Sequence, residues 1–262
     1  MRIFGFPATL IHGDTLVLDR WLWLKRHLKT VQPGAGRLLD VGCGTGAFTL
    51  GAAKLGYRSL GLSWDERNQR VAQDRAKICK LRNAEFEIQD ARHLDQRTDL
   101  EGKFDVAICC ECIEHILDDS KLMKDMARCL KPGGTLLLTT PNFDFRPMAF
   151  DNDVLDLNGT GGHVRRGYTP QDLTRISESS GFSVRSIEYC SGVLSQKLTS
   201  MQRIASRLAS ELVGWTLVLP FRWIPPSLDR AASRWTNWPG YSITLVAQRN
   251  EQGIHDGAQE TS

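Results

Sequence analysis

The sequence lacks several features that would place it in a membrane or on a secretory route. No stretch reaches about 18 uncharged apolar residues, so no helix that spans a bilayer is expected. The first residues lack a basic segment followed by an apolar run and a small-residue cleavage site, so we expect no signal peptide. A net charge of +3 is too small to argue for binding to nucleic acid. No internal repeat is present.

The cysteines lack the arrangement of a disulfide framework. The chain has 7 of them, an odd number. Cys109, Cys110 and Cys112 are not a zinc site, because a strand sends neighbouring residues to opposite faces. With 262 residues, 41% of them hydrophobic, the chain can bury a core without disulfides, in one large or two small domains. We therefore expect reduced, mostly buried thiols in a cytoplasmic protein.

Strand and helix patterns alternate from Leu38 to about Thr140, which predicts a parallel sheet with helices on both faces. After a first strand near residues 37–41, strands are expected over 57–62, 84–88, 104–110, 135–140, 182–189 and 241–248. Helices are expected over 15–28, 66–80, 120–130 and 170–181. The segment 131–134, Lys-Pro-Gly-Gly, is expected to end a helix and form a turn.

Residues 37–46 read as a strand, a tight loop and the start of a helix. Gly42, Gly44 and Gly46 stand at alternate positions shortly after Asp40. Glycine permits positive φ and lets a ligand approach the main chain closely. The N–H groups of the new helix favour an anionic or polar ligand. The loop matches neither the Gly-Lys-Ser/Thr of a phosphate-binding P-loop nor the G-x-G-x-x-G of a dinucleotide site.

The string at 38–46, Leu-Leu-Asp-Val-Gly-Cys-Gly-Thr-Gly, resembles motif I of the class I S-adenosylmethionine-dependent methyltransferases. Later segments follow in the order of that family, and the chain resembles its ubiquinone-type and other small-molecule O-methyltransferases. The resemblance implies an α/β, Rossmann-like seven-stranded sheet whose last two strands form an antiparallel edge hairpin. The expected domains are a helical leader (1–36), the methyltransferase domain (37–250) with a helical, apolar insertion (190–240) before the last strand, and a flexible tail (251–262).

The resemblance implies S-adenosylmethionine as the cofactor. Its methionine part would be bound by the glycine loop (Gly42, Gly44, Gly46), with Asp40 near the ammonium group. A ribose diol is usually bound by an acidic residue at the end of the second strand, but that position holds Ser63 in this chain. Asp65, two residues further on, could point the same way if the strand continues. Alternatively, Asp65 only caps the next helix and Ser63 replaces the acid.

The adenine side is expected directly after the third strand. In similar enzymes the residue equivalent to Asp90 accepts a hydrogen bond from the adenine amino group. The N–H of the next residue, Ala91, would reach a ring nitrogen. The structural alternative is that Asp90 only begins a loop and binds no ligand.

Three polar side chains follow the fourth expected strand, at the edge where ligands bind in open α/β folds. If a helical turn starts there, Glu111, Glu114 and His115 share one face. The segment resembles the Glu-x-x-Glu-His of ubiquinone-type O-methyltransferases. It also resembles the metal-binding segment of small-RNA 3′-end 2′-O-methyltransferases, which implies that these three residues and His163 would be the matching metal set.

We predict His115 and His163 as the catalytic residues, with Glu111 beside the cofactor. A histidine suits general-base catalysis on a hydroxyl near neutral pH. Alternatively, the four residues hold a divalent ion that polarises the hydroxyl. We favour the base without a metal. A structural interpretation, in which Glu114 and His115 only shape the pocket, stays open. The other histidines are expected to be surface or structural residues: His12, His27, His93 and His255.

The leader and the insertion lie outside the resemblance. Asp14 is expected to cap the helix at 15–28, which should pack on the sheet rather than form a lid, with Arg20 among cations suited to its C-terminal end. In the insertion, an amphipathic helix is expected over 198–213, with Arg203 and Arg207 on its polar side. A Trp-rich apolar run follows at 215–226. It fits core packing, which we favour, a substrate lid, an interfacial anchor or a dimer surface.

The sequence therefore predicts methyl transfer from S-adenosylmethionine to a hydroxyl of a small molecule. The apolar insertion and the Gly/Arg-rich loop at 159–168 favour a lipid-like or glycosylated acceptor. Metal-assisted 2′-O-methylation of RNA and a non-catalytic S-adenosylmethionine-binding partner protein are the alternatives. The expected partner is the small-molecule acceptor, with peripheral membrane or hydrophobic-substrate contact through 212–226 left open.

Overall fold

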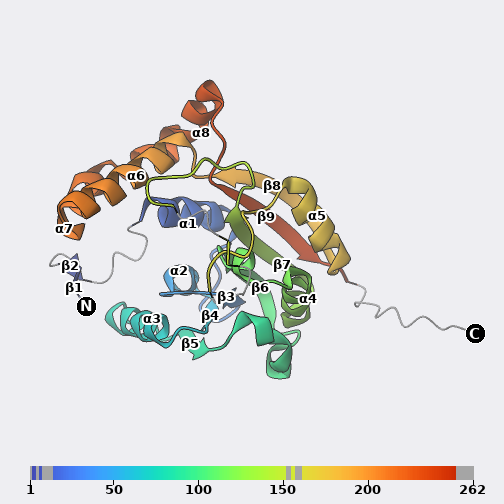
Figure 1. Ribbon diagram of the computed structural model, residues 1–262. Helices are drawn as coiled ribbons and strands as arrows, with labels where there is room; N and C mark the ends of the chain where they lie inside the picture. Colours follow the sequence, from blue (N-terminus) through green and yellow to red (C-terminus); the bar gives the residue numbers. More distant parts are fainter. Residues whose placement is uncertain (1, 4–5, 8–13, 152–154, 157–160, 252–262) are drawn as a thin grey trace, which may run out of the picture.

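The computed structural model describes residues 2–3, 6–7, 14–151, 155–156 and 161–251. In this part of the chain a seven-stranded sheet has helices on both faces (Figure 1). A further group of helices lies beside the first helix of the chain, which covers one of these faces. Two short strands, β1 (Arg2–Ile3) and β2 (Phe6–Pro7), pair antiparallel near the N-terminus. Most of the predicted tail, together with His12 and His255, lies outside the described residues.

The large sheet has the order β5-β4-β3-β6-β7-β9-β8. Its strands are β3 (Arg37–Val41), β4 (Arg58–Ser63), β5 (Ala84–Ile88), β6 (Phe104–Cys110), β7 (Leu130–Pro141), β8 (Phe182–Cys190) and β9 (Ser242–Arg249). The first five in this order are parallel, and β9 runs antiparallel to both β7 and β8. The predicted sheet and its antiparallel edge pair are confirmed.

Alternate strand residues face different helices. Leu38 and Ile108 pack with side chains of α1 (Thr15–His27) and α2 (Ala47–Lys54). Their neighbours Leu39 and Cys109 pack in the cluster that includes α4 (Asp119–Cys129) and α5 (Pro170–Ser179). Next to α2 lies α3 (Glu66–Ile78), which leads back toward β5. Both faces are thus covered, as a parallel sheet requires.

Turn chemistry explains several helix ends. Asp14 caps α1 by accepting from the N–H of Val17 at 3.0 Å, as predicted. Trp23 of this helix is 2% exposed against the sheet, which confirms packing on the sheet. The helix α4 ends at Cys129, before the Lys-Pro-Gly-Gly segment. However, β7 already begins at Leu130, earlier than predicted, because Leu130 pairs with Phe104.

The insertion forms α6 (Val193–Leu208), α7 (Glu211–Val218), the short 3₁₀ helix η4 (Leu219–Phe221) and α8 (Ile224–Thr236). The prediction of one helix over 198–213 is wrong. The chain leaves the helical conformation at Ala209, and Ser210 caps the next helix by accepting from the N–H of Val213. Among the described residues, no helix combines the length and apolar character needed to cross a bilayer.

The seven cysteines are free, in agreement with the sequence prediction. Buried positions hold Cys43, Cys109, Cys110 and Cys129, and the others are partly buried. Burial raises the pKa of the Cys110 thiol well above its usual value, so this thiol is neutral and serves packing.

Candidate active site

The glycine loop joins β3 to α2. Gly42, Gly44 and Gly46 adopt φ of 77°, 51° and 77°. A Cβ on Gly42 would lie 2.5 Å from Sγ of Cys112, and one on Gly46 would lie 2.7 Å from the ring of Phe86. A Cβ on Gly44 would meet no atom within 4 Å. The outer glycines therefore allow close packing within the protein, whereas the middle one borders open space where a ligand can approach the backbone.

Asp40 lies on β3 just below this loop and is 1% exposed. One carboxylate oxygen accepts a hydrogen bond from Thr49 Oγ1, on α2, at 2.6 Å. Burial raises the pKa of Asp40 to about 6, although the bond from Thr49 opposes the shift. Thr49 is a site residue that the sequence prediction missed; its place on the first turns of the helix after the loop was the available signal. That Asp40 faces the ammonium of a cofactor remains a prediction.

The end of β4 is built around Ser63, which is 6% exposed. Asp65 accepts from the N–H of Asn68 at 3.0 Å and so caps α3, the structural role foreseen for it. The backbone N–H of Asp65 points to Ser63 Oγ at 3.4 Å. Between them, Trp64 is 62% exposed, and a Cβ on Gly161 would lie 3.8 Å from its ring. The exposed indole thus stands between this strand end and the loop that carries His163.

Asp90 begins the 3₁₀ helix η1 (Ala91–Gln96) and accepts from the N–H of Arg92 at 2.9 Å. The guanidinium of Arg92 also contacts both carboxylate oxygens, with the shortest distance 2.6 Å. Burial alone would raise the pKa of Asp90, but the bonds from Arg92 outweigh it and hold the pKa below its usual value. Ala91 is 9% exposed. An adenine amino group would therefore share an ionised carboxylate with Arg92.

Glu111 turns away from the predicted cluster. Its φ is 50°, and the 3₁₀ helix η3 (Ile113–His115) starts only two residues later. The carboxylate pairs with Arg20 of α1 at 2.9 Å and accepts hydrogen bonds from Thr139 and Ser242 at 3.0 Å and 3.1 Å. The prediction that Glu111 shares one helical face with Glu114 and His115 is therefore wrong.

Arg20 is the second residue whose role the sequence prediction missed. It was grouped with the cations at the C-terminal end of its helix, but it lies in mid-helix and is 8% exposed. Its guanidinium also donates to Ser242 Oγ on β9 at 3.1 Å. A buried charge needs such a partner, so the leader helix is tied to the strand edge through Glu111.

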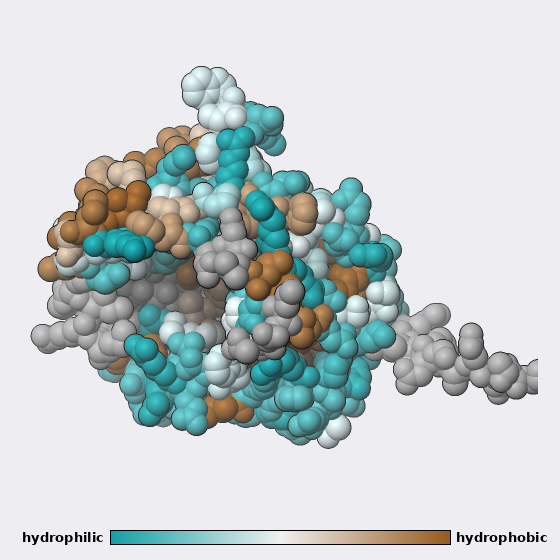
Figure 2. All heavy atoms as spheres, viewed as in Figure 1, coloured by the Kyte–Doolittle hydropathy of each residue, from teal (hydrophilic) through white to brown (hydrophobic). Residues whose placement is uncertain are grey.

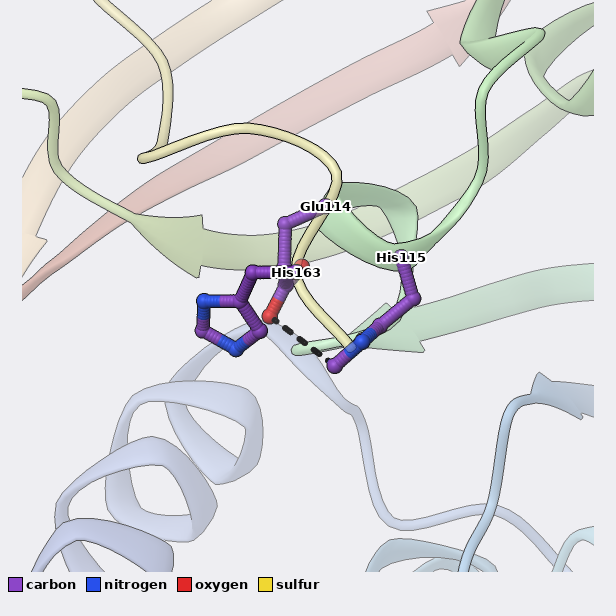
Figure 3. Close-up of side chains that lie close together, drawn as sticks. All are labelled: Glu114, His115 and His163. Atoms are coloured by element: carbon purple, nitrogen blue, oxygen red, sulfur yellow. Dashed lines mark ion pairs between the residues drawn. The ribbon is translucent and has the colours of Figure 1, made fainter. Parts of the chain in front are cut away.

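The two predicted catalytic histidines lie close together, beside Glu114 (Figure 3). The rings of His115, on η3, and His163, on the loop before α5, lie edge to face with centroids 4.6 Å apart. His115 Nδ1 lies 3.0 Å from the carbonyl oxygen of Gly162, so Nδ1 carries the proton of a neutral ring and Nε2 offers its lone pair. Burial, and then the neighbouring His115, lower the pKa of His163, which keeps this ring neutral near pH 7.

Glu114 completes this group. It is 0% exposed; Oε2 accepts from Thr140 Oγ1 at 3.1 Å, and Oε1 lies 4.0 Å from His115 Nε2. Oε1 has no hydrogen-bond partner among the described residues. Burial, reinforced by the nearby Glu111, raises the pKa of Glu114 well above its usual value. A carboxyl group buried this deeply is stabilised when it binds a proton or a cation.

A family model of the methyltransferase domain matches residues 20–187. This chain belongs to that family. The chain is 31% identical over 155 residues to the ubiquinone biosynthesis O-methyltransferase of Coxiella burnetii, a match that covers 57% of this chain and 64% of that protein. It therefore spans less than two thirds of the length of this relative. To the enzyme of the same name from Xanthomonas axonopodis pv. citri it is 28% identical over 188 residues, covering 68% of this chain and 74% of the other.

Solved structures show the same fold at lower identity. The [4+2]-cyclase SpnF superposes with a TM-score of 0.62 at 22% identity, covering 90% of this chain and 83% of that one. Geranyl diphosphate C-methyltransferase from Streptomyces coelicolor A3(2) gives 0.59 at 17% identity, covering 88% and 77%. The predicted Rossmann-like methyltransferase fold is confirmed. The insertion helices α6 to α8 follow the end of the family match at residue 187.

In this methyltransferase domain, Glu114, His115 and His163 each offer one ligand atom, and these atoms all lie within 4.8 Å of one another. One carboxylate and two imidazoles with open positions suit a divalent metal ion. The unpartnered Oε1 of Glu114 fits such a role. Among the described residues Glu111 does not belong to this group, so three of the four residues in the predicted metal set come together.

Proposed function

We propose that this protein transfers a methyl group from S-adenosylmethionine to a hydroxyl oxygen of a small molecule. One observation carries the proposal: a Cβ on Gly42 would lie 2.5 Å from Sγ of Cys112, so the glycine loop touches the segment that presents His115, whose ring meets that of His163. The strands that carry the two, β3 and β6, are neighbours and parallel. Cofactor loop and histidine pair therefore share one edge of the sheet, as a displacement reaction needs.

The residues fit the cofactor. The open space at Gly44 admits its methionine part. The carboxyl groups of Asp40, near the end of β3, and Asp90, just after β5, follow parallel strands that are separated by β4 in the sheet. When bound, S-adenosylmethionine supplies a methyl group on a positively charged sulfur. The chain's own contribution is to hold this methyl and the acceptor oxygen in line, at about 3–3.5 Å. Membership of the methyltransferase family supports this cofactor.

His163 and His115 supply the proton acceptor. As the oxygen–carbon bond forms and the carbon–sulfur bond breaks, the hydroxyl proton passes to a ring nitrogen. Neutral His163 can accept this proton. In neutral His115 the bond from Nδ1 to the carbonyl of Gly162 leaves Nε2 as the basic nitrogen. The mechanism needs either ring within hydrogen-bond reach of the hydroxyl.

The acceptor class that we propose is lipid-like or glycosylated. The names of the two curated relatives described above place them in ubiquinone biosynthesis, and we extend to this chain the methylation of a partly apolar hydroxyl compound. Exposed aromatic side chains on the loop that leads to His163 support it, with Phe143 at 48% and Phe150 at 55%. A similar structure is a cyclase, so the fold alone does not fix the reaction.

Metal-assisted oxygen methylation is a second candidate, and the buried, unpartnered Oε1 of Glu114 favours it. Here Glu114, His115 and His163 would hold a divalent ion that polarises the acceptor hydroxyl. We favour the base without a metal, because the raised pKa of Glu114 lets this carboxyl bind a proton instead. RNA as acceptor has less support, since the whole chain carries a net charge of only +3.

The test is to incubate the purified protein with methyl-labelled S-adenosylmethionine and a lipid extract, and to find the labelled product by mass spectrometry. A labelled methyl ether of a lipid-like compound supports the proposal. Binding of S-adenosylmethionine by calorimetry without turnover on any extract would instead identify a non-catalytic binding protein. Loss of activity with EDTA, and its return with magnesium or manganese, would select the metal-assisted candidate.

A further inference from the structure

The helix α7 is apolar on almost every side, yet the protein buries little of it. Only Gly214 and Val218 are buried in α7, on the side that packs against α6. Gly214 permits that contact, since a Cβ there would lie 2.1 Å from Ser206 Oγ. Leu212 and Leu217 remain 52% and 45% exposed. A helix that is apolar all round is normally buried in protein or in lipid, and the described chain leaves this one uncovered.

The exposure continues onto the neighbouring helices and forms one apolar face, which Figure 2 shows over α6 and α7. Met201, Ile204 and Leu208 stand three and four residues apart on α6, so they share one side of that helix. We call the whole face the insertion surface. Its exposed apolar residues are Met201, Ile204, Leu208, Leu212, Val213, Leu217, Phe221, Trp223, Ile224 and Leu228. Monomeric proteins rarely expose so many apolar side chains together without a partner.

Positive charge accompanies the apolar residues. Residues 193–236 contain six cations, Lys197, Arg203, Arg207, Arg222, Arg230 and Arg234, and two acids, Glu211 and Asp229, which gives this segment a net charge of +4. The whole chain carries +3, so the rest of the chain is slightly acidic. The net positive charge of the segment lies at its surface, because one of its two acids, Asp229, is only 8% exposed. Its carboxylate accepts a hydrogen bond from the N–H of Leu194 inside the protein.

The insertion surface is linked to the loop that leads to His163. Arg203 of α6 pairs with Asp151, and Ser200 Oγ accepts from the N–H of Ala149 at 3.3 Å. Arg207 lies over the ring of Phe150, 4.5 Å from its centroid. The helix α6, which carries part of the insertion surface, thus contacts residues 149–151 of the loop that leads to His163.

We propose that the insertion surface docks on an anionic lipid bilayer. Leucine, phenylalanine and tryptophan side chains interleaved with arginines are the composition of helices that lie in the membrane interface. Arg222, 4.9 Å from the ring of Trp223, can keep its charge at the headgroups while the indole enters the apolar region. Two copies joined symmetrically through the same face would bring two segments of charge +4 together, which disfavours a dimer.

Docking needs no catalysis, so it can be tested independently of the proposed function. The full chain is mixed with vesicles of phosphatidylcholine, with or without about one third phosphatidylglycerol, and bound protein is measured by flotation. We expect binding to the anionic vesicles, and a drop of at least about tenfold when ionic strength is raised to about 1 M. Brominated lipids should quench tryptophan fluorescence in the parent and less in Trp223→Phe.

Matched variants distinguish vesicle binding through the insertion surface from nonspecific adsorption of the protein. The combined variant Leu217→Ser, Phe221→Ser and Trp223→Ser should reduce vesicle binding at least about tenfold. Ile78→Ser, at a residue 42% exposed on α3, should leave it unchanged. Arg230→Glu should weaken binding to anionic vesicles, whereas Arg70→Glu, on α3, should not. All six residues are exposed, so folding is expected to survive, with circular dichroism as the check.

Two outcomes overturn the proposal. One is equal flotation of the parent and the combined variant on anionic vesicles. The other is a parent that ignores vesicles but forms a dimer in light scattering, with the combined variant monomeric; that result would assign the insertion surface to a second copy of the chain.

Discussion

The ring of His163 meets the ring of His115 edge to face, with centroids 4.6 Å apart, although one belongs to a loop and the other to the segment after β6. Changing either to glutamine should lower kcat by about 10²-fold or more, because the hydroxyl loses its proton acceptor. His27→Gln on α1 is the matched control and should keep parental turnover. Steady-state assays with and without EDTA provide the measurement. Parental turnover in both site variants would leave positioning alone as the mechanism.

The pH dependence of turnover should report the state of His163. Burial and the neighbouring His115 lower the pKa of His163 below its usual value of 6.5. A general base works only when neutral, so kcat/KM should hold at pH 6.5 and fall as pH drops further below that value. His163→Gln should abolish this acidic limb. A limb that persists unchanged in the variant would assign it to another group.

The middle glycine of the loop offers a direct test of cofactor binding. Gly44→Ala puts a methyl group into the open space at the candidate cofactor site, so affinity for S-adenosylmethionine should fall at least tenfold, or about 1.4 kcal/mol. Strain at φ 51° should also cost about 1–2 kcal/mol of stability. Gly102→Ala, with φ 63° and no atom within 4 Å, carries the same strain far from the site. Calorimetric titration of both variants decides; parental affinity in Gly44→Ala would exclude this loop as the binding site.

Gly42→Val tests a different contact. The Cβ atom of the valine would lie 2.5 Å from Sγ of Cys112, so the substitution should destabilise the protein itself, whether or not a ligand is bound. We expect a loss of stability of about 1–3 kcal/mol or more, from overpacking, together with weaker cofactor binding. Thermal unfolding without cofactor measures the first effect. An unchanged Tm would show that the loop relaxes away from Cys112.

The ion pair between Arg20 and Glu111 should be important for the leader helix. Arg20→Met leaves the carboxylate of Glu111 without its partner at 2.9 Å, and should destabilise the fold by about 3–5 kcal/mol. Adding Glu111→Gln to it should recover part of that loss, since no charge is then left unpaired. Urea unfolding of the two single variants and the double variant measures the coupling. Additive losses would show that the two side chains act independently.

Two carboxyl groups, one of the leader and one of the insertion, contact the same serine hydroxyl, and this arrangement should make the free energy of unfolding depend on pH. Ser195 Oγ lies 2.5 Å from an oxygen of Asp19 and 2.6 Å from one of Asp229. A hydroxyl has one proton to donate, so one carboxyl group is protonated in this arrangement. Burial raises the pKa of Asp19 to about 6 from 3.8, a change that corresponds to roughly 3 kcal/mol.

The sign follows from linkage. Because the folded-state pKa of Asp19 is raised, its contribution to stability is complete below about pH 4 and is lost as pH rises through about 6. Asp19→Asn keeps a donor for Ser195 and cannot ionise. Its Tm relative to the parent should therefore increase as pH rises from about 4 to 7. Calorimetry measures this, and Asp74→Asn on α3 is the exposed control. A constant difference in Tm would place the shared proton elsewhere.

Local chemistry along the chain was enough to predict much of the protein. β6 begins and ends at the predicted residues, because an apolar run bounded by turn residues marks a buried parallel strand. The bounds of β5, an edge strand in which apolar and charged residues alternate, were also predicted. The cap of α1, Asp14, also lies where a short polar side chain stands before a helical pattern. The glycine loop was predicted for a similar reason: three glycines between a strand and a helix have few other uses.

Tertiary structure decided what depends on partners distant in the chain. Glu111 turns to Arg20, and His163 reaches His115, through contacts that no spacing in the sequence encodes. The insertion was expected to be one amphipathic helix and a packed apolar run. The folded chain instead breaks the helix at Ala209, where Ser210 caps the next helix, and leaves Trp223 exposed. Periodicity shows which residues can be buried together, but only the packed chain determines which of them find a partner.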